Sequence, residues 1–217
     1  MTFSFDTIED FDNHISNSIP NYSTLTEMIL SVTPFITVPN TSVIDIGAGT
    51  CELLNRLDHD ANLKYAIEPS TNLLYQKDFR LHRWNMTVED SLNILPNDAS
   101  LMMSIFTLQF IRKDKRQEIV NKIHDSLVPN GGFIWAEKVR CDHSLHQEML
   151  TFAHYDLKRK VFTADEILDK EQDLRRLMRP NTTVENLQIA RNAGFKNIPL
   201  LMWKMFNFEC YLFRKES

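Results

Sequence analysis

The chain has 217 residues, which suits one α/β domain with a buried core and is short for two. Hydrophobic residues make up 43% of the chain, which excludes an intrinsically disordered protein. The net charge is −5 and no basic stripe is present, so bulk binding of nucleic acid by counterion release is not favoured.

The three cysteines, Cys51, Cys141 and Cys210, are odd in number and far apart, which indicates reduced thiols and a cytoplasmic location. The first residues lack the basic and apolar regions of a signal peptide. No apolar run is long enough to span a bilayer, so we expect no membrane partner.

The first half of the chain alternates short apolar runs with helical segments. The predicted helices cover 6–16, 22–33, 50–57 and 71–77, and the predicted strands cover 42–46, 64–68, 81–84 and 99–106. The strand over 42–46 stops at Gly47 and a helix follows directly, which is typical of the opening of a βαβ unit.

In the second half, a helix over 113–127 is predicted to end at the glycine-rich turn Pro129-Asn130-Gly131-Gly132. The remaining predicted elements are a strand over 133–137, two or more helices within 143–179, a helix over 183–192, and an antiparallel strand pair over 199–213.

This order predicts an α/β protein with a Rossmann-like class I methyltransferase fold: a mostly parallel sheet with a C-terminal antiparallel strand and a helical insertion. We expect one S-adenosylmethionine-binding domain over 1–217. Its predicted parts are cover helices at 1–40, a nucleoside-binding core at 41–141, the insertion at 142–180, and a helix with the strand pair at 181–217.

The motif Asp45-Ile46-Gly47-Ala48-Gly49 ends the first strand. Its first glycine permits a tight turn, and its second lets a ligand approach the backbone. We expect Asp45 to lie near the ligand's amino-acid part or to organise the loop through backbone N–H groups. Glu68 ends the next strand, where an acid can accept hydrogen bonds from both ribose hydroxyls.

Two alternatives apply to this motif. Two glycines alone are equally well explained by a tight structural turn, and only Glu68, the element order and the C-terminal strand pair favour a nucleoside site. A nicotinamide site is disfavoured because the third glycine of its motif falls on Glu52, which would repel a pyrophosphate. S-adenosylmethionine has no phosphate.

Several segments from about residue 18 to 208 share one pattern. They are Ser18-Ile19-Pro20-Asn21-Tyr22-Ser23, the glycine motif, Phe106-Thr107-Leu108-Gln109-Phe110, Gly131-Gly132-Phe133 with Glu137-Lys138, Asp156-Leu157-Lys158-Arg159, Asn192-Ala193-Gly194-Phe195 and Phe206-Asn207-Phe208. In these the chain resembles the carboxy-S-adenosylmethionine synthases, bacterial enzymes related to methyltransferases that act in tRNA wobble-uridine modification.

The resemblance implies S-adenosylmethionine as cofactor and a homodimer through the helical insertion. It places the cofactor contacts at Tyr22, Gly47, Ala48, Gly49, Glu68, Pro69, Thr87 and Val88. Phe106 and Gln109 are expected to wall the pocket, and Ile105 stands where the family has an asparagine.

One departure concerns the arginine with which the family binds the carboxylate of the carboxymethyl group. Alignment places Glu171 or Gln172 there, and a carboxylate would repel a carboxylate. Arg175 lies one helical turn beyond Glu171 and can reach the same space, although such a pair is also typical of a surface i,i+4 ion pair.

We therefore put methyl transfer from S-adenosylmethionine to an unknown acceptor first. Carboxy-S-adenosylmethionine synthesis in tRNA modification is the second hypothesis, and a non-catalytic binding module the third. Methyl transfer mainly needs positioning, and the candidates for catalytic residues are Tyr22, His154 and Tyr155, although a helix-face histidine is more often a packing residue. No metal is expected, because His143 and His146 lack a third ligand at a recognisable spacing.

Overall fold

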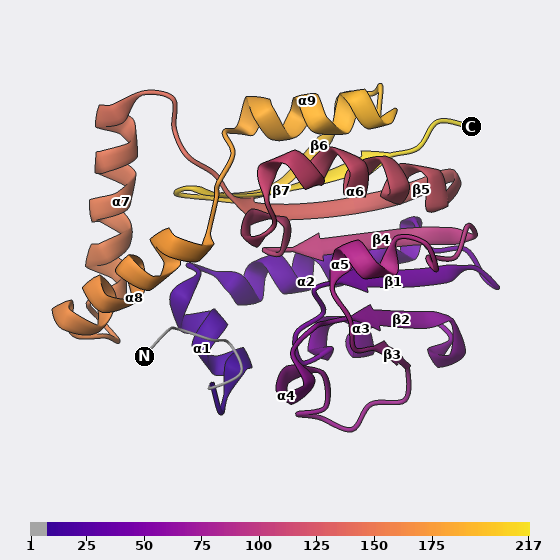
Figure 1. The fold of residues 1–217 in the computed structure, drawn as a ribbon, viewed down its shortest axis with the longest axis horizontal. Coiled ribbons are helices and arrows are strands. Elements are labelled where there is room, and N and C mark those ends of the chain that lie inside the picture. Colours follow the sequence, from indigo (N-terminus) through magenta and orange to yellow (C-terminus); the bar gives the residue numbers. More distant parts are fainter. Residues whose placement is uncertain (1–7) are drawn as a thin grey trace.

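The computed structural model describes residues 8–217, so the first two residues of the helix predicted over 6–16 lie outside it. Seven strands form one sheet in the order β3-β2-β1-β4-β5-β7-β6 (Figure 1). The strands are β1 (Ser42–Ile46), β2 (Lys64–Ile67), β3 (His82–Trp84), β4 (Ala99–Ile105), β5 (Leu127–Lys138), β6 (Leu200–Met205) and β7 (Phe208–Arg214). The pairs from β3 to β5 are parallel and β7 is antiparallel to β5 and β6, as predicted.

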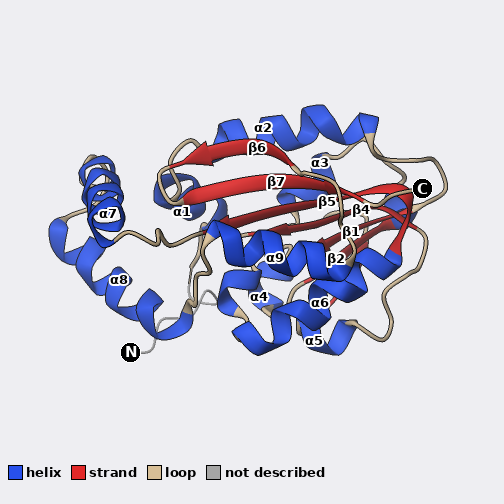
Figure 2. Ribbon diagram, turned by 90° about the horizontal axis from the view of Figure 1, so that it is seen from above, coloured by secondary structure: helices blue, strands red, loops and turns tan. Residues whose placement is uncertain are grey.

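The sheet lies between two layers of helices (Figure 2). The helices are α1 (Phe11–Ser18), α2 (Tyr22–Val32), α3 (Glu52–Arg56), α4 (Thr71–Leu74), α5 (Val88–Ser91), α6 (Lys113–Ser126), α7 (Ser144–Lys158), α8 (Ala164–Leu177) and α9 (Thr183–Ala193). Leu25 of α2 and Leu54 of α3 pack on one face of the sheet, and Val120 of α6 and Ala190 of α9 pack on the other. Because successive side chains of a strand point to opposite faces, a fully buried strand such as β1 supplies both cores.

The predicted insertion forms two helices, α7 and α8, which stand beyond the carboxyl ends of the parallel strands (Figure 1). Thr163 and Glu166 form a capping box at the start of α8, and Thr182 and Glu185 form another at the start of α9. Each box satisfies backbone N–H groups that a helix start leaves unpaired.

The prediction that a glycine-rich turn ends α6 is wrong. Leu127 is already extended and pairs with Ala99 of β4, so the helix passes straight into β5. Pro129-Asn130-Gly131-Gly132 lies within that strand, where the pairing with β4 shifts register. The left-handed residue there is Asn130, with φ 62°, and neither of the glycines.

Three smaller differences from the prediction concern the helices α1, α4 and α5. Helix α1 begins at Phe11 because Asp10 caps it, its side chain accepting a hydrogen bond from the Asn13 N–H at 3.2 Å. Helix α4 is shorter than predicted, and α5 was not predicted. Among residues 8–217, no helix is both long enough and apolar enough to cross a membrane.

Candidate functional site

A cavity of about 660 Å³ opens at the carboxyl ends of the parallel strands, within the size range of small-molecule sites. Gly47, Gly49 and Glu68 line one end of it. Lys138 and helices α7 and α8 line the other. The strand order changes direction between β1 and β4, so the cavity lies where doubly wound α/β sheets bind ligands.

The glycine turn is fixed by its neighbours as well as by its conformation. Gly47 has φ +75°, and its N–H donates to the carbonyl of Ile67 at 2.8 Å. A Cβ at Gly47 would lie 2.2 Å from Oγ1 of Thr107, in the loop after β4. Only glycine therefore lets the first turn of the motif approach this loop.

Gly49 also has a positive φ, +53°, and it faces the cover helix α1. A Cβ there would lie 3.1 Å from the ring of Phe11, which lines the cavity. Phe11 was not singled out from the sequence, because nothing in a short amphipathic helix marks which aromatic residue reaches a distant turn.

Glu68 is buried, with 8% of its surface exposed, and its carboxylate lies on the glycine turn. Oε2 accepts a hydrogen bond from the Gly49 N–H at 3.1 Å, and Oε1 accepts one from the Ser70 N–H at 2.9 Å. Glu68 thus takes the loop-organising role that the sequence offered to Asp45, and it stays at the cavity wall, where an acid can accept ribose hydroxyls.

Asp45 lies beneath the turn and is not among the described residues that line the cavity. It is buried, and its Oδ1 has no hydrogen-bond partner within residues 8–217. Burial, and then the charge of Glu68, raise the pKa of Asp45 to about 7. The structure thus separates Asp45 from the ligand-facing wall.

Pro69, Thr87 and Val88 continue the wall beside Glu68. Thr87 caps α5, because its Oγ1 accepts a hydrogen bond from the Asp90 N–H at 3.2 Å. Its hydroxyl also donates to Oδ2 of Asp90 at 2.6 Å. Hydrogen bonds within this segment therefore fix the loop that is predicted to pass the adenine ring.

The middle of the cavity is lined by Ile105, Phe106 and Gln109. Phe106 has φ 58°, and its ring meets that of Phe208 edge to face at 5.8 Å. The side chain of Gln109 accepts a hydrogen bond from the Lys138 N–H at 2.7 Å and so joins the loop after β4 to the end of β5.

Besides Asp45, two further predicted cofactor contacts fall outside this lining: Ala48 and Tyr22 are not among the described residues that face the cavity. The Tyr22 ring lies 6.4 Å from the Phe106 ring, centroid to centroid. Burial, with help from the charges of Asp45 and Asp12, raises the pKa of the Tyr22 hydroxyl, which therefore stays protonated. Tyr22 packs against the same core as Phe106.

The far end of the cavity carries three lysines, Lys138, Lys158 and Lys170, and one acid, Glu171. Oε1 of Glu171 lies 3.4 Å from Nζ of Lys158 and 3.7 Å from Nζ of Lys138. Burial alone would raise the pKa of Glu171, but the two lysines outweigh it and hold the pKa below its usual value. Lys170 in turn contacts His14 of α1.

Sequence reasoning missed these lysines as site residues. Lys138 and Lys158 do lie in two of the segments that carry the family resemblance, Glu137-Lys138 and Asp156-Leu157-Lys158-Arg159, so a signal was present. Only the fold brings the end of β5 and the end of α7 together.

The expectation of a surface ion pair between Glu171 and Arg175 is wrong, because the Glu171 side chain is only 12% exposed and pairs with lysines. Arg175 and Tyr155 line an adjoining cavity of about 420 Å³ and are not among the described residues that line the larger one. Lys138, His154 and Glu171 line both cavities and form part of the wall between them.

His154 is buried in this wall, with its Nε2 3.1 Å from the carbonyl oxygen of Ser18 and its ring stacked on Phe206. Burial, and then the charges of Lys158 and Lys138, lower the pKa of His154 to about 4. The ring is therefore neutral near pH 7, and this geometry favours the packing role over acid–base catalysis.

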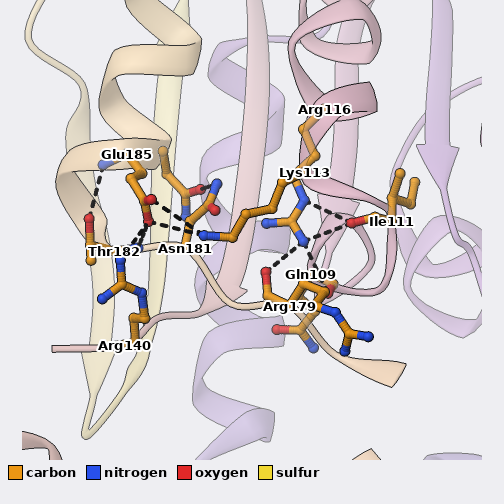
Figure 3. Close-up of polar contacts among 10 residues, drawn as sticks. Gln109, Ile111, Lys113, Arg116, Arg140, Arg179, Asn181, Thr182 and Glu185 are labelled. Carbon is orange, nitrogen blue, oxygen red and sulfur yellow. Dashed lines mark hydrogen bonds and ion pairs between the residues drawn. The ribbon is translucent and has the colours of Figure 1, made fainter. Parts of the chain in front are cut away.

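Arg116 of α6 anchors the loop that lines the middle of the cavity (Figure 3). Its guanidinium is buried and donates hydrogen bonds to the carbonyls of Gln109, Ile111 and Arg179, at 3.2, 2.8 and 2.6 Å. The Arg179 N–H donates to the same Gln109 carbonyl at 2.8 Å. The end of the insertion is thus tied to the cavity loop.

The start of the insertion is tied down beside its end (Figure 3). The Arg140 N–H donates to the carbonyl of Asn181 at 2.9 Å, and the Arg140 guanidinium lies 3.4 Å from Glu185. Lys113 lies 3.3 Å from the same carboxylate. Helices α7 and α8 therefore leave the core and return to it through one polar cluster.

No protein-family model matches this chain. A carboxy-S-adenosyl-L-methionine synthase of Methylococcus capsulatus is 30% identical over 210 residues, covering 91% of this chain and 86% of the relative. The enzyme of the same name from Campylobacter hominis is 30% identical over 213 residues, covering 94% and 90%.

Solved structures agree on the fold. An S-adenosylmethionine-dependent methyltransferase of Thermotoga maritima matches with a TM-score of 0.62 at 16% identity, over 98% of both chains. One from Leishmania major matches with a TM-score of 0.62 at 14% identity, over 96% of this chain and 79% of that one.

The fold is therefore that of the class I S-adenosylmethionine-dependent methyltransferases, as the sequence predicted. Within this class the chain belongs to the carboxy-S-adenosyl-L-methionine synthase family, which makes it an S-adenosylmethionine-dependent transferase.

Proposed function

We propose that this protein seats S-adenosylmethionine with its adenosine across Gly47–Gly49, its ribose hydroxyls on Glu68, and its sulfonium toward Phe106 and the lysine end of the cavity. The buried carboxylate of Glu68 on the glycine turn supports the nucleoside half of this arrangement. The cavity continues from there to Lys138 and Lys158, which supports the other half.

Carboxy-S-adenosylmethionine synthesis is the reaction that this geometry supports best. The single observation that carries it is the pair of ammonium groups of Lys138 and Lys158 at the lysine end, which share one buried carboxylate, that of Glu171. On the sequence alone, Glu171 is expected to repel a ligand that carries a carboxymethyl group. The positive charges of Lys138 and Lys158 exceed the one negative charge of Glu171, so these three side chains together carry a charge of +1 and attract a ligand carboxylate.

Methyl transfer is the second candidate. Glu171 already compensates one of the two lysines, so a ligand with a plain methyl group in place of the carboxymethyl group leaves no bare cation pair behind. Transfer of a methyl group from a sulfonium needs alignment and exclusion of water more than a base, so the neutral His154 is no obstacle. A binding module without catalysis would show ligand binding and no turnover with any acceptor.

Mass spectrometry of the small molecules released from purified, denatured protein separates the two reactions. The carboxylated nucleoside should be recovered from the wild-type protein and should be lost with Glu68→Gln. Recovery of S-adenosylmethionine and S-adenosylhomocysteine alone would favour methyl transfer. Release of no nucleoside, with no binding of either ligand by calorimetry, would contradict both.

The finer expectations about partners and location have separate support. Apolar side chains are exposed on and between α7 and α8: Leu145, Met149, Phe152, Val161 and Leu168. They support the proposed homodimer through the insertion. Light scattering of the wild type against Phe152→Glu tests it, with a dimer expected to become a monomer. The three free cysteines support a reducing, cytoplasmic location.

A further inference from the structure

Glu171 is the one acid at the lysine end of the cavity among the described residues that line it there. Its side chain is 12% exposed, that of Lys158 is 6% exposed and that of Lys138 is 19% exposed. All three come from different elements: α8, α7 and the end of β5. They meet only in the folded protein, facing a cavity large enough for a ligand.

The buried Glu171 carboxylate and the two lysine ammonium groups compensate one another's charge. A carboxylate taken out of water is costly unless ammonium groups or hydrogen bonds compensate it. Burial likewise disfavours the charged form of Lys158, and its pKa is lowered accordingly. The two lysines therefore require an anion at this place, and Glu171 supplies it from within the chain.

A ligand carboxylate is the same chemical group as the Glu171 side chain. The ligand carboxylate and the Glu171 carboxylate therefore compete for ion pairs with the same two ammonium groups, and each weakens the pairing of the other. Glu171 has a place to withdraw to, because it also lines the adjoining cavity, where Tyr155 and Arg175 lie. The Tyr155 side chain already interacts with both Arg175 and Glu171.

We propose that Glu171 is an internal carboxylate that competes with the carboxylate of a ligand for Lys138 and Lys158. The site takes a sulfonium nucleoside that carries a second carboxylate, on a carboxymethyl group, and Glu171 lowers the affinity of the site for that ligand relative to S-adenosylmethionine. Glu171 is thus a specificity-determining residue. This inference rests on the proposed function, because it requires the nucleoside to lie with its sulfonium toward the lysines.

The test is calorimetric titration of the full chain with S-adenosylmethionine and with carboxy-S-adenosylmethionine, taking the ratio of the two Kd values. Glu171→Gln removes the competing charge and should shift the ratio about tenfold toward the carboxylated ligand. Affinity for S-adenosylmethionine should change less, because the two ligands share the same amino-acid part and differ only in the presence of the carboxylate that competes with Glu171. Lys158→Gln should shift the ratio in the opposite direction.

Asp173→Asn is the matched control. It removes the same charge from the same helix, but Asp173 is not among the described residues that line either cavity. Its ratio should equal that of the wild type. If a thermal melt shows that Glu171→Gln is unfolded, Glu171→Asp is measured in its place and should shift the ratio in the same direction, because its shorter side chain draws the carboxylate back from the lysines.

An unchanged ratio in the folded Glu171 variant, or an equal shift in Asp173→Asn, would overturn this inference and leave the proposed function standing. Failure of the proposed function has a different signature: the wild type binds neither ligand, or Glu68→Gln binds both as tightly as the wild type.

Discussion

The two ends of the cavity are built in different ways. At the glycine end, the binding groups come from the ends of β1 and β2, which are neighbours in both sequence and space. At the lysine end, Lys138, Lys158 and Glu171 come from three elements that meet only through the insertion. In the proposed pose, the adenosine lies at the glycine end, whose residues are close in sequence. The variable group lies at the lysine end, whose residues come together only in the tertiary structure.

The largest expected effect is at the glycine end. Gly47→Ala places a Cβ 2.2 Å from Oγ1 of Thr107 at a residue with φ +75°. The free energy of unfolding should fall by about 2 kcal/mol or more, and binding of S-adenosylmethionine should be lost. Chemical denaturation and calorimetry measure the two effects. Adding Thr107→Gly should restore part of the stability, and no restoration would show that the contact with Thr107 is not the cause.

Glu68→Gln sharpens the comparison because it keeps the size of the side chain, removes its charge and replaces one acceptor oxygen with a donor. Weaker acceptance of two ribose hydroxyls should raise the Kd for S-adenosylmethionine about tenfold to a hundredfold. Glu89→Gln is the control, since Glu89 is exposed and lines the same cavity. Its Kd should stay within about twofold of the wild type. Equal effects of the two substitutions would remove Glu68 from the ribose site.

Arg116→Lys tests how firmly the insertion, which carries part of the lysine end, is tied to the cavity loop. A lysine keeps the charge, but it cannot donate to the carbonyls of Gln109, Ile111 and Arg179 together. The free energy of unfolding should fall by about 2 kcal/mol. Hydrogen exchange should rise in residues 109–112 and 178–181 before it rises at Gly47–Gly49. A uniform rise would contradict the separate construction of the two ends.

The pH dependence of stability distinguishes two buried acids, Asp45 beneath the glycine turn and Glu137 near the end of β5. Burial raises the pKa of Glu137 to about 8, whereas that of Asp45 is raised to about 7. Between its ordinary pKa and the raised one, each acid holds a proton in the folded state that the unfolded chain has released. The free energy of unfolding therefore falls as pH rises, by at most about 1.4 kcal/mol per pH unit for each proton.

Between pH 7 and 8, Glu137 contributes most of this fall, because Asp45 is already losing its proton there. Denaturation curves at pH 6, 7 and 8 should show Glu137→Gln flattening both intervals, whereas Asp45→Asn should flatten mainly the interval from pH 6 to 7. A wild-type stability that rises with pH across this range would have the wrong sign for both acids.

The smallest effect is expected for His154, whose pKa of about 4 keeps it neutral. His154→Gln should change turnover by less than about threefold, because loss of a general base would cost about 100-fold or more. The pH profile of turnover between about 5.5 and 8 should not move. Loss of its acidic limb would place His154 in the chemistry after all.

The sequence is informative where the chemistry is local. Strand, glycine turn and following acid are contiguous signals, so β1, Gly47 and Glu68 could be predicted and found together. The C-terminal pair β6 and β7 was predicted from its alternating pattern around Phe206-Asn207. The family and the fold follow from such signals.

The rest depends on packing that a single sequence does not reveal. Pro129-Asn130-Gly131-Gly132 has the composition of a helix-ending turn, but pairing of Leu127 with β4 draws it into a strand. Glu171 has the i,i+4 spacing of a surface pair with Arg175, but α7 buries it against Lys158. In both cases a tertiary contact overrides the local pattern.

A crystal structure with S-adenosylmethionine bound tests the central claim most directly. The ribose hydroxyl oxygens should lie within hydrogen-bond distance of the Glu68 carboxylate, with the adenosine across Gly47–Gly49 and the sulfonium on the side of Lys138. A nucleoside seated elsewhere, with the Glu68 carboxylate far from both ribose hydroxyls, would contradict the account.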